Sequence, residues 1–321
     1  MTSIMPKQGD TCPICKQHTL ALSKQTCTDY ISKQSFSLLH CTHCGCYVTH
    51  GELQQDYYGQ AYYNSKKGKF SPLIEKIFKL NHQRNAKQFY QRFQPKRILE
   101  IGCGRAYLLK ELKQLDCEVY CLESDEAADW ILNNADVNMI TESKLDFPAQ
   151  YFDLIIYWHV FEHLPDPVAS LRQMTTLLAD NQRICISVPN ADSYQAKLQL
   201  STWFHLDVPR HLYHFTPQSL VMLLESEGYE IESIEAGDMI QNLYGWLQSL
   251  ANLFTPKEIN GFYRFLQGGK PLKTLSKTAL ITQLVTSIIW IPVGILGYLI
   301  ETLAGKHGSI TVYARKKHRK Y

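Results

Sequence analysis

The residues with the clearest capacity for chemistry near the start of the chain are four cysteines in two C-x-x-C pairs. Cys12 and Cys15 form the first pair, and Cys41 and Cys44 form the second. Two such pairs can place four thiolates tetrahedrally around a zinc ion. The alternative is a set of unligated thiols. We expect structural zinc, because a segment of about 50 residues buries too little core to fold without a metal.

A second group of chemistry-bearing residues lies at a glycine turn. The apolar stretch Arg97–Ile101 is typical of a short strand and leads directly into Gly102, Cys103 and Gly104. Apolar residues then recur at helical spacing. Because the two glycines lack Cβ atoms, the backbone can turn sharply there and approach a ligand closely. A strand that passes through glycines into a helix is typical of the first unit of a nucleotide-binding α/β domain.

Two carboxylates accompany this turn. Glu100 lies at the end of the first strand, and Glu123 follows the next apolar stretch, Glu118–Leu122. The carboxyl ends of parallel strands meet at one edge of a sheet, so both side chains should face the same crevice. An acidic residue about 20 residues beyond the glycines suits the hydroxyls of a ribose. The pattern therefore predicts a site for a nucleoside with free hydroxyls.

A third motif, H-x-x-E-H, follows a later strand. The apolar stretch Phe152–Tyr157 runs into His159, Glu162 and His163. Zinc proteases use the same spacing to put two histidines on one helix face. Here two prolines follow closely and end any helix within a turn, so we favour a loop. We expect His159 to contact substrate or order the loop, and the other two residues to hold the loop through hydrogen bonds.

In this order, the motifs resemble those of the class I S-adenosylmethionine-dependent methyltransferases, in the branch whose fourth strand precedes an H-V-L-E-H-x-P-D-P-like loop. The resemblance covers residues 96–234 and resumes at residues 309–315. It implies that S-adenosylmethionine is held by Glu100, Gly102, Cys103, Gly104, Glu123 and His159, with Ser143 and Leu145 near its adenine. The family usually has glycine where Ala106 stands, and alanine is small enough to keep the close packing.

The resembled fold is a Rossmann-like α/β domain with a seven-stranded methyltransferase sheet whose seventh strand is antiparallel. The expected strands are residues 97–101, 118–122, 137–140, 152–157, 184–188, 229–235 and 309–315. The expected helices among them are residues 106–114, 125–133, 168–178 and 218–227. Another helix should start after Ser71 and Pro72 and end before Pro95.

Three consecutive segments follow from these elements. Residues 1–50 would form a small zinc ribbon, and residues 51–95 a tyrosine-rich linker or active-site flap followed by a helix. Residues 96–321 would form the methyltransferase domain, with a helical hydrophobic insertion at 236–308 before the last strand.

The segment after the fifth strand, residues 203–216, is rich in histidine, arginine and aromatic side chains. Its place in the fold should put it at the active-site end of the sheet. We expect Arg210, His211 and His214 to meet an anionic or proton-bearing substrate group, and His159 or His211 to take the acceptor's proton. The alternative is a structural loop whose histidines bind backbone carbonyls.

The insertion contains an uncharged stretch, residues 278–300, that is long enough to span a bilayer. Both of its ends must return to one sheet, which excludes a single crossing. Pro292, Gly294 and Gly297 instead suggest a re-entrant or in-plane hairpin. Residues 242–254 add an amphipathic candidate, and residues 315–320 a basic tail. Together they predict peripheral membrane contact through residues 241–303 and the tail; a buried hairpin that caps the substrate or joins a dimer is the alternative.

The composition of the chain bears on its binding partners and its cellular compartment. The 321-residue chain has a net charge of +3, too small by itself to indicate nucleic acid. Residues 1–19 are polar and lack an apolar leader, so we expect a cytoplasmic protein attached peripherally to the inner face of the membrane. In that compartment, disulfides among the ten cysteines are not expected.

The predicted activity is transfer of a methyl group from S-adenosylmethionine to an oxygen, nitrogen or carbon atom. A small-molecule, lipid-like or quinone-like acceptor fits the apolar insertion, and a sugar fits a resemblance to zinc-ribbon sugar methyltransferases. RNA fits the ribbon and the basic tail, but no long basic aromatic face accompanies them. A non-catalytic interaction protein on a methyltransferase scaffold is the remaining alternative; the intact carboxylates and glycines argue against it.

Overall fold

The computed structural model describes residues 6–52, 72–123, 136–141, 145–198, 200–266 and 276–317. The chain forms two compact units that alternate along the sequence, in contrast to the consecutive segments expected above. The ribbon unit comprises Met1–Ser71, Val188–Leu223 and Glu235–Ile310. The sheet unit comprises Pro72–Ser187, Leu224–Ile234 and Thr311–Tyr321. The tyrosine-rich stretch that we considered as a flap lies outside the described residues.

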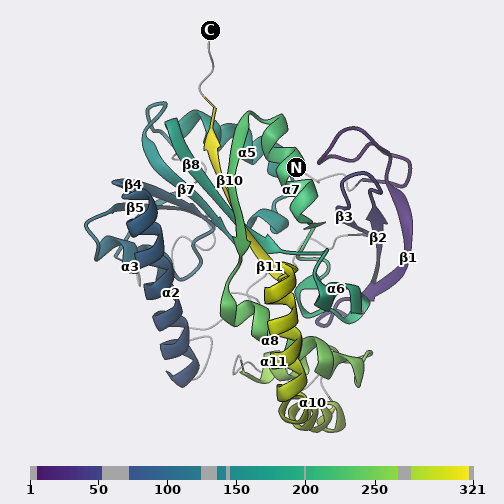
Figure 1. Cartoon of the computed structure of the whole chain (residues 1–321). Coiled ribbons are helices and arrows are strands. Elements are labelled where there is room, and N and C mark those ends of the chain that lie inside the picture. Colours follow the sequence, from purple (N-terminus) through teal and green to yellow (C-terminus); the bar gives the residue numbers. More distant parts are fainter. Residues whose placement is uncertain are drawn as a thin grey trace. The chain divides into compact units, whose positions relative to one another are not determined.

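The sheet unit is built on the seven-stranded sheet that the sequence predicts, with one antiparallel strand (Figure 1). In spatial order its strands are β10 (Tyr229–Ala236), β11 (Ser309–Lys316), β8 (Leu178–Pro189), β7 (Phe152–Trp158), β4 (Arg97–Ile101), β5 (Glu118–Glu123) and β6 (Asn138–Thr141). The five strands from β8 to β6 pair in parallel. The expected Rossmann-like methyltransferase fold is thereby confirmed.

Burial on both faces explains why the central strands are almost continuously apolar. Four of the five residues of β4 are buried, and so are five of the seven residues of β7. Parallel strands covered on both sides read in this way, because neither face meets water. One core cluster joins the strands to the helix that follows β4 through Ile98, Leu109, Leu112, Val119, Leu154 and Ile156.

Helices connect and cover these strands. They are α2 (Pro72–Phe93), α3 (Tyr107–Lys113), η2 (Phe161–His163) and α5 (Pro167–Leu177), whereas α7 (Pro217–Ser226) begins in the ribbon unit and ends in the sheet unit. The side chain of Phe89 on α2 meets the rings of Trp158 and Tyr313 at centroid distances of 5.8 and 6.0 Å. Helix α2 therefore packs along the sheet, as its apolar spacing predicts. The helix expected at 125–133 lies outside the described residues.

The ribbon unit contains a second, four-stranded antiparallel sheet. Its strands are β1 (Ala21–Thr28), β2 (Ser35–His40), β3 (Tyr47–His50) and β9 (Tyr213–His214), in that order. Strand β9 comes from the histidine-rich segment and pairs with β3 through Tyr47 and Val48. Three short helices belong to the same unit: α6 (Tyr194–Leu198), η3 (Leu200–Thr202) and η4 (Phe204–Leu206). The ribbon is thus completed by a strand from far along the chain.

The insertion before the last strand folds as helices α8 (Met239–Leu253), α9 (Gly261–Leu266), α10 (Lys277–Ile289) and α11 (Ile291–Ala304). Both α10 and α11 pack on α8 (Figure 1). Trp246 and Leu250 of α8 are buried, so the amphipathic surface expected at 242–254 is an interior helix. Among the described residues no single helix is long and apolar enough to cross a membrane, whereas α10 and α11 qualify as a pair bent by 60°.

Candidate functional site

The glycine turn after β4 has the backbone conformation that the sequence predicts for it. Gly102 and Gly104 have φ angles of +66° and +55°, in the left-handed region that favours glycine. A Cβ added to Gly102 would lie 2.4 Å from Cγ2 of Val160, whereas one added to Gly104 would meet nothing within 4 Å. Gly102 is therefore required by packing inside the protein, and Gly104 borders open space in which a ligand can approach.

Glu100 is a buried carboxylate beside this turn. Its side chain is 4% exposed, and its Oε2 atom has no hydrogen-bond partner among the described residues. Desolvation raises the pKa of Glu100 to about 8, with a further contribution from the charge of Glu123. A buried acid left without a partner is costly to a protein, so it indicates a position where a ligand's donor groups belong.

Glu123 ends β5, the strand next to β4, and is tied to the same turn. Its Oε2 atom accepts a hydrogen bond of 3.3 Å from the backbone N–H of Gly104. The N–H of Gly102 donates to the carbonyl oxygen of Leu122 at 2.8 Å. The two carboxylates and the turn therefore form one constellation at the carboxyl ends of β4 and β5, where α/β sheets bind their ligands.

A disulfide between Cys103 and Cys121 lies inside this constellation. Our expectation that the chain contains no disulfide is wrong at this position. The two cysteines lie on the turn and on β5, next to each other in the folded sheet but 18 residues apart in sequence. The Cys103 thiol is not free, so its part in binding a ligand is restricted to its backbone.

His159 follows β7 within the sheet unit. Its backbone N–H donates to the carbonyl oxygen of Ser187 at 2.9 Å, and its φ angle is +54°. The Nδ1 atom lies 3.7 Å from Oε1 of Glu162, and the buried Nε2 atom has no hydrogen-bond partner among the described residues. The H-x-x-E-H stretch contains a single 3-10 turn, η2, instead of a helix that could present two histidines on one face.

The structure says less about the residues expected near an adenine. Ser143 lies outside the described residues. Leu145 is half-buried in the irregular segment after β6.

Three residues that the sequence reasoning missed tie α2 to the turn. The Tyr107 hydroxyl donates a short hydrogen bond to Oε2 of Glu75, and Nη1 of Arg105 lies 3.5 Å from the other carboxylate oxygen. Arg105 directly follows Gly104, so α2 holds the chain where it leaves the turn. No spacing in the sequence connects Glu75 with residues about 30 positions later, because the contact depends on how α2 packs against α3.

Arg210, expected to meet substrate, is wholly buried in the ribbon unit. Its guanidinium lies 3.0 Å from Asp29 and 2.5 Å from Asp207, and 4.5 Å from the ring centroid of Tyr30. Burial alone would lower the pKa of Arg210, but Asp207, Tyr30 and Asp29 raise it above its usual range. This side chain is already matched by two carboxylates, so the geometry favours a structural role.

His211 and His214 are likewise held by neighbours inside the ribbon unit. Nδ1 of His211 lies 2.8 Å from the carbonyl oxygen of His205. Nε2 of His214 lies 3.0 Å from the Thr49 hydroxyl, which also donates to the carbonyl oxygen of His211 at 2.7 Å. These contacts match the structural alternative, in which the histidines bind backbone carbonyls and order the loop.

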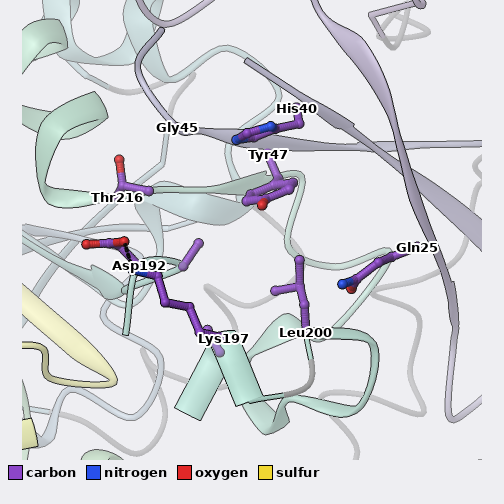
Figure 2. A pocket seen from close by; sticks show the side chains of 10 residues that line it. Gln25, His40, Gly45, Tyr47, Asp192, Lys197, Leu200 and Thr216 are labelled. Carbon is purple, nitrogen blue, oxygen red and sulfur yellow. Dashed lines mark ion pairs between the residues drawn. The ribbon is translucent and has the colours of Figure 1, made fainter. Parts of the chain in front are cut away.

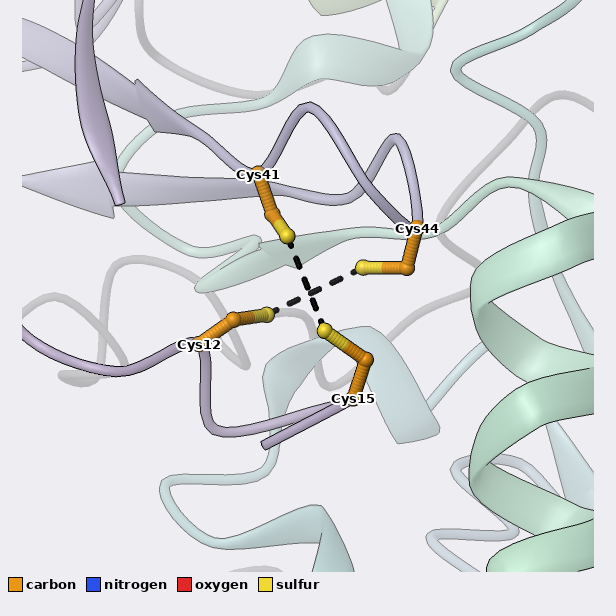
Figure 3. A group of neighbouring side chains, drawn as sticks. All are labelled: Cys12, Cys15, Cys41 and Cys44. Atoms are coloured by element: carbon orange, nitrogen blue, oxygen red, sulfur yellow. Dashed lines mark hydrogen bonds between the residues drawn. The ribbon is translucent and has the colours of Figure 1, made fainter. Parts of the chain in front are cut away.

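The four cysteines of the two C-x-x-C pairs converge in the ribbon unit (Figure 3). Sulfur atoms of Cys12 and Cys44 lie 3.8 Å apart, and those of Cys15 and Cys41 lie 3.6 Å apart. Four sulfurs at about 2.3 Å from a tetrahedral zinc ion would be roughly 3.8 Å apart, so the cluster fits the metal. A hydrogen bond from Cys44 lowers the pKa of Cys12, as suits a thiolate ligand.

A hollow of about 270 Å³ also lies within the ribbon unit, lined by side chains of β1 to β3 and α6 (Figure 2). His40 and Tyr47 stack there with ring centroids 4.2 Å apart. Its one carboxylate, Asp192, lies 2.5 Å from Nζ of Lys197 and also pairs with Lys306. Its charges are therefore matched internally, and we assign no ligand to it.

Comparisons with known proteins agree with this geometry. A family model described as a methyltransferase domain matches residues 74–234, half of the chain. The chain belongs to this family, and it is an S-adenosylmethionine-dependent methyltransferase.

The individual relatives have low sequence identity to this chain. The ubiquinone biosynthesis O-methyltransferase of Xanthomonas euvesicatoria pv. vesicatoria is 23% identical over 181 residues, which cover 51% of this chain and 73% of that protein. Its counterpart in Ruegeria pomeroyi is 25% identical over 170 residues, covering 49% and 68%. A solved S-adenosylmethionine-dependent methyltransferase from Archaeoglobus fulgidus shares 18% identity with a TM-score of 0.46, over 81% of this chain and 100% of that one.

Proposed function

We propose that the chain binds S-adenosylmethionine at the ends of β4 and β5 and methylates a small, apolar acceptor. The observation that carries the donor site is the buried, unpartnered Glu100 carboxylate beside a left-handed glycine turn, with Glu123 on the neighbouring strand. This set provides an acid for an ammonium group, space beside Gly104, and an acid for a ribose diol. S-adenosylmethionine fits these three features, and it supplies an electrophilic methyl group when bound.

The chain's own residues have distinct parts in this proposal. Glu100 would hold the amino-acid part of the donor through its free Oε2 atom, which would lower the pKa of this carboxyl group on binding. Glu123 would accept hydrogen bonds from the ribose hydroxyls. Glu75 and Arg105 would keep the turn in place, because they join its exit to α2. The catalytic gain would come mainly from alignment in a site that excludes water.

His159 is the residue best placed to handle the acceptor's proton within the sheet unit. If Nδ1, the ring nitrogen nearer Glu162, carries the hydrogen, Nε2 is left as an acceptor. Nε2 is buried and lacks a partner among the described residues, so an acceptor hydroxyl could use it. His159 would then orient that hydroxyl and take its proton as the methyl group is transferred.

The acceptor class rests on two supports of different kinds. The relatives named above act in ubiquinone biosynthesis as O-methyltransferases, which favours an oxygen atom on a quinone-like ring. The apolar insertion favours an acceptor that partitions into lipid. We therefore propose O-methylation of a lipid-like small molecule.

A labelled-methyl assay tests this proposal. The purified protein is incubated with radiolabelled S-adenosylmethionine and, separately, with lipid extract, RNA and sugar nucleotides from the same cells. We expect label in the organic phase, and a loss of at least about tenfold in Glu123→Ala but not in Glu118→Ala, at the other end of β5. Label in RNA or sugar nucleotides would contradict the acceptor class, and no transfer with intact donor binding would favour a non-catalytic scaffold.

A further inference from the structure

The helices α10 and α11 have their polarity reversed relative to helices on a water-exposed surface. On α10, the residues that face the protein are Ala279, Gln283 and Ser287, all buried. The residues that face outward include Ile281, Val285 and Ile288, and Ile288 is 68% exposed. A surface helix in water buries its apolar stripe and exposes its polar one. Helix α10 does the opposite.

Helix α11 repeats this reversal. Its inner face carries Gly294 and Glu301, both buried, while Leu296, Leu299 and Leu303 are exposed, the last at 90%. A Cβ added to Gly297 would lie 2.8 Å from the Trp246 ring, so α11 approaches α8 closely through small residues. Small residues at such contacts are the usual way in which helices pack in lipid. The exposed apolar residues of α10 and α11, among them the six named above, are called the outer face.

The inward amide of Gln283 on α10 is hydrogen-bonded within the ribbon unit. The Gln283 amide donates to Thr255 Oγ1 at 2.6 Å and to the Glu258 carbonyl at 2.7 Å, and its oxygen accepts from the Phe262 N–H at 2.8 Å. This network fixes α10 with its apolar side outward. The orientation is therefore held by specific bonds and is not an accident of loose packing.

Glu301 fixes α11 in the same way. Its carboxylate accepts from the backbone N–H of Gln195 at 2.9 Å, from the amide of that residue at 3.0 Å, and from Trp246 Nε1 at 2.8 Å. An acid with three donors is stable inside the protein. Rotating α11 to hide its leucines would leave this acid without them.

Two threonine hydroxyls on these helices are satisfied by the backbone of their own helix. Thr286 Oγ1 donates to the carbonyl oxygen of Thr282 at 2.7 Å, and Thr302 Oγ1 to that of Tyr298 at 2.8 Å. Such bonds to the preceding turn of the same helix satisfy a hydroxyl in an apolar solvent, whereas the buried Oγ of Ser287 has no partner among the described residues. No charged residue interrupts positions 278–300. The stretch that carries most of the outer face is therefore uncharged.

From these observations we infer that the outer face of α10 and α11 inserts into one leaflet of a lipid bilayer. Each helix is about 20 Å long at 1.5 Å per residue, shorter than the roughly 30 Å hydrocarbon core, so neither crosses it. The two helices are bent by 60° relative to each other, so the pair does not form one straight span. Exposed Lys277 at the start of α10 is suited to lipid phosphates. Membrane binding needs no methyl donor, so it is separable from the proposed reaction.

Vesicle flotation tests this inference on the full chain. The protein is mixed with phosphatidylcholine vesicles, with and without phosphatidylglycerol, at low and at high salt. We expect it to float in every case, because an uncharged face binds independently of salt. The double substitution Ile288→Asp and Leu299→Asp should lower the vesicle partition coefficient at least about tenfold.

The matched control is Leu22→Asp with Leu198→Asp, two apolar residues of the same unit that are 52% and 56% exposed outside these helices. It should float like the wild type, and both double variants should keep their affinity for S-adenosylmethionine, which shows that they fold. Equal flotation of the outer-face variant, or a wild type that never floats, would overturn the inference. If vesicle binding were sensitive to salt and unchanged in the outer-face variant, the binding would be assigned to the basic tail instead of α10 and α11.

Light scattering addresses the other occupant of such a face, a second copy of the chain. We expect a monomer in vesicle-free buffer or, if the chain associates, association that the outer-face variant leaves unchanged. A wild-type dimer that this variant converts to monomer, without vesicle binding by either, would contradict membrane insertion. Quenching by brominated lipid, lost in Trp290→Phe, would place the bend between the two helices in the bilayer.

Discussion

Burial of the Glu100 carboxyl group lowers the stability of the protein at neutral pH, and the same group is proposed to bind the methyl donor. Its folded pKa of about 8 lies above the ordinary value of 4.5, so the folded chain retains a proton that the unfolded chain loses between these values. The folded state binds more protons in that window, and stability therefore falls as pH rises from about 5 to 8. Below pH 4.5 the effect vanishes, because both states are protonated.

Glu100→Gln should remove this dependence. Relative to the wild type, the variant should gain on the order of a few kcal/mol in unfolding free energy between pH 5 and pH 8, and it should bind S-adenosylmethionine at least tenfold more weakly. Urea denaturation at several pH values measures the first effect. Parallel curves for the two proteins across this range would contradict the buried, unpartnered state of the carboxylate.

The two glycines of the turn should differ when each is replaced by alanine. Gly104→Ala adds a side chain in open space and should cost about 1 kcal/mol, from its left-handed backbone alone. Gly102→Ala also collides with Val160 and should cost about 1–3 kcal/mol more. Thermal unfolding of both variants makes the comparison, with Gly104→Ala the one that chiefly loses donor affinity. The reverse order of stabilities would show that the turn is built differently.

Arg210 offers a test of structural against substrate roles. Arg210→Met leaves Asp29 and Asp207 without their cation and should destabilise the ribbon unit by about 3–5 kcal/mol. Arg172→Met removes a guanidinium that is itself 58% exposed from its pair with Glu227, and it should cost clearly less than Arg210→Met. Denaturation measures both. If the Arg210→Met protein were stable and bound the donor but no longer transferred methyl groups, that result would support a substrate-binding role for Arg210.

At the scale of elements, the strands of the large sheet were predictable and the orientation of the inserted helices was not. A short, continuous apolar run such as Arg97–Ile101 strongly favours a buried strand, and β4 has these bounds. The periodicity of α8 suggested a surface helix, yet Trp246 is buried. A sequence shows that a helix has two unlike faces, but only its packing partners decide which face turns inward.

The candidate site likewise contains features that could be predicted from the sequence and features that could not. The C-x-x-C pairs and the glycine turn are local patterns, so their residues could be named from the sequence. The joining of β9 to β3, and of Glu75 to Tyr107, depends on contacts between distant segments that carry no local signal. For that reason the sequence left both a substrate-binding and a structural role open for the histidine-rich segment, whose bonds lie within the ribbon unit.

The ribbon should depend on its metal. We expect one zinc ion per chain by mass spectrometry, and loss of that ion in Cys41→Ala. Chelation at elevated temperature should unfold the ribbon, measured as new protease cleavage within residues 6–52, because zinc binding supplies its folding free energy. Cys27→Ala, a buried cysteine outside the cluster, is the control and should retain zinc. A metal-free wild type with an intact ribbon would contradict this assignment.

At the scale of the whole molecule, the proposed donor site and the proposed membrane-binding face lie in different units. An apolar acceptor presented in vesicles should therefore be methylated faster than the same acceptor in detergent micelles. Ile288→Asp with Leu299→Asp should abolish that advantage without changing the donor's dissociation constant. Initial rates in the two media measure the effect. An advantage that survives the substitutions would mean that lipid access does not depend on α10 and α11.

Calorimetric titration of S-adenosylmethionine into the purified protein tests the central claim most directly, because it needs no knowledge of the acceptor. We predict one site per chain, with proton release between pH 6 and 8 as Glu100 ionises, and at least about tenfold weaker binding in Glu123→Ala. Glu118→Ala should bind like the wild type. Absence of binding at millimolar donor, or wild-type affinity in both Glu123→Ala and Glu100→Gln, would contradict a donor site at the ends of β4 and β5.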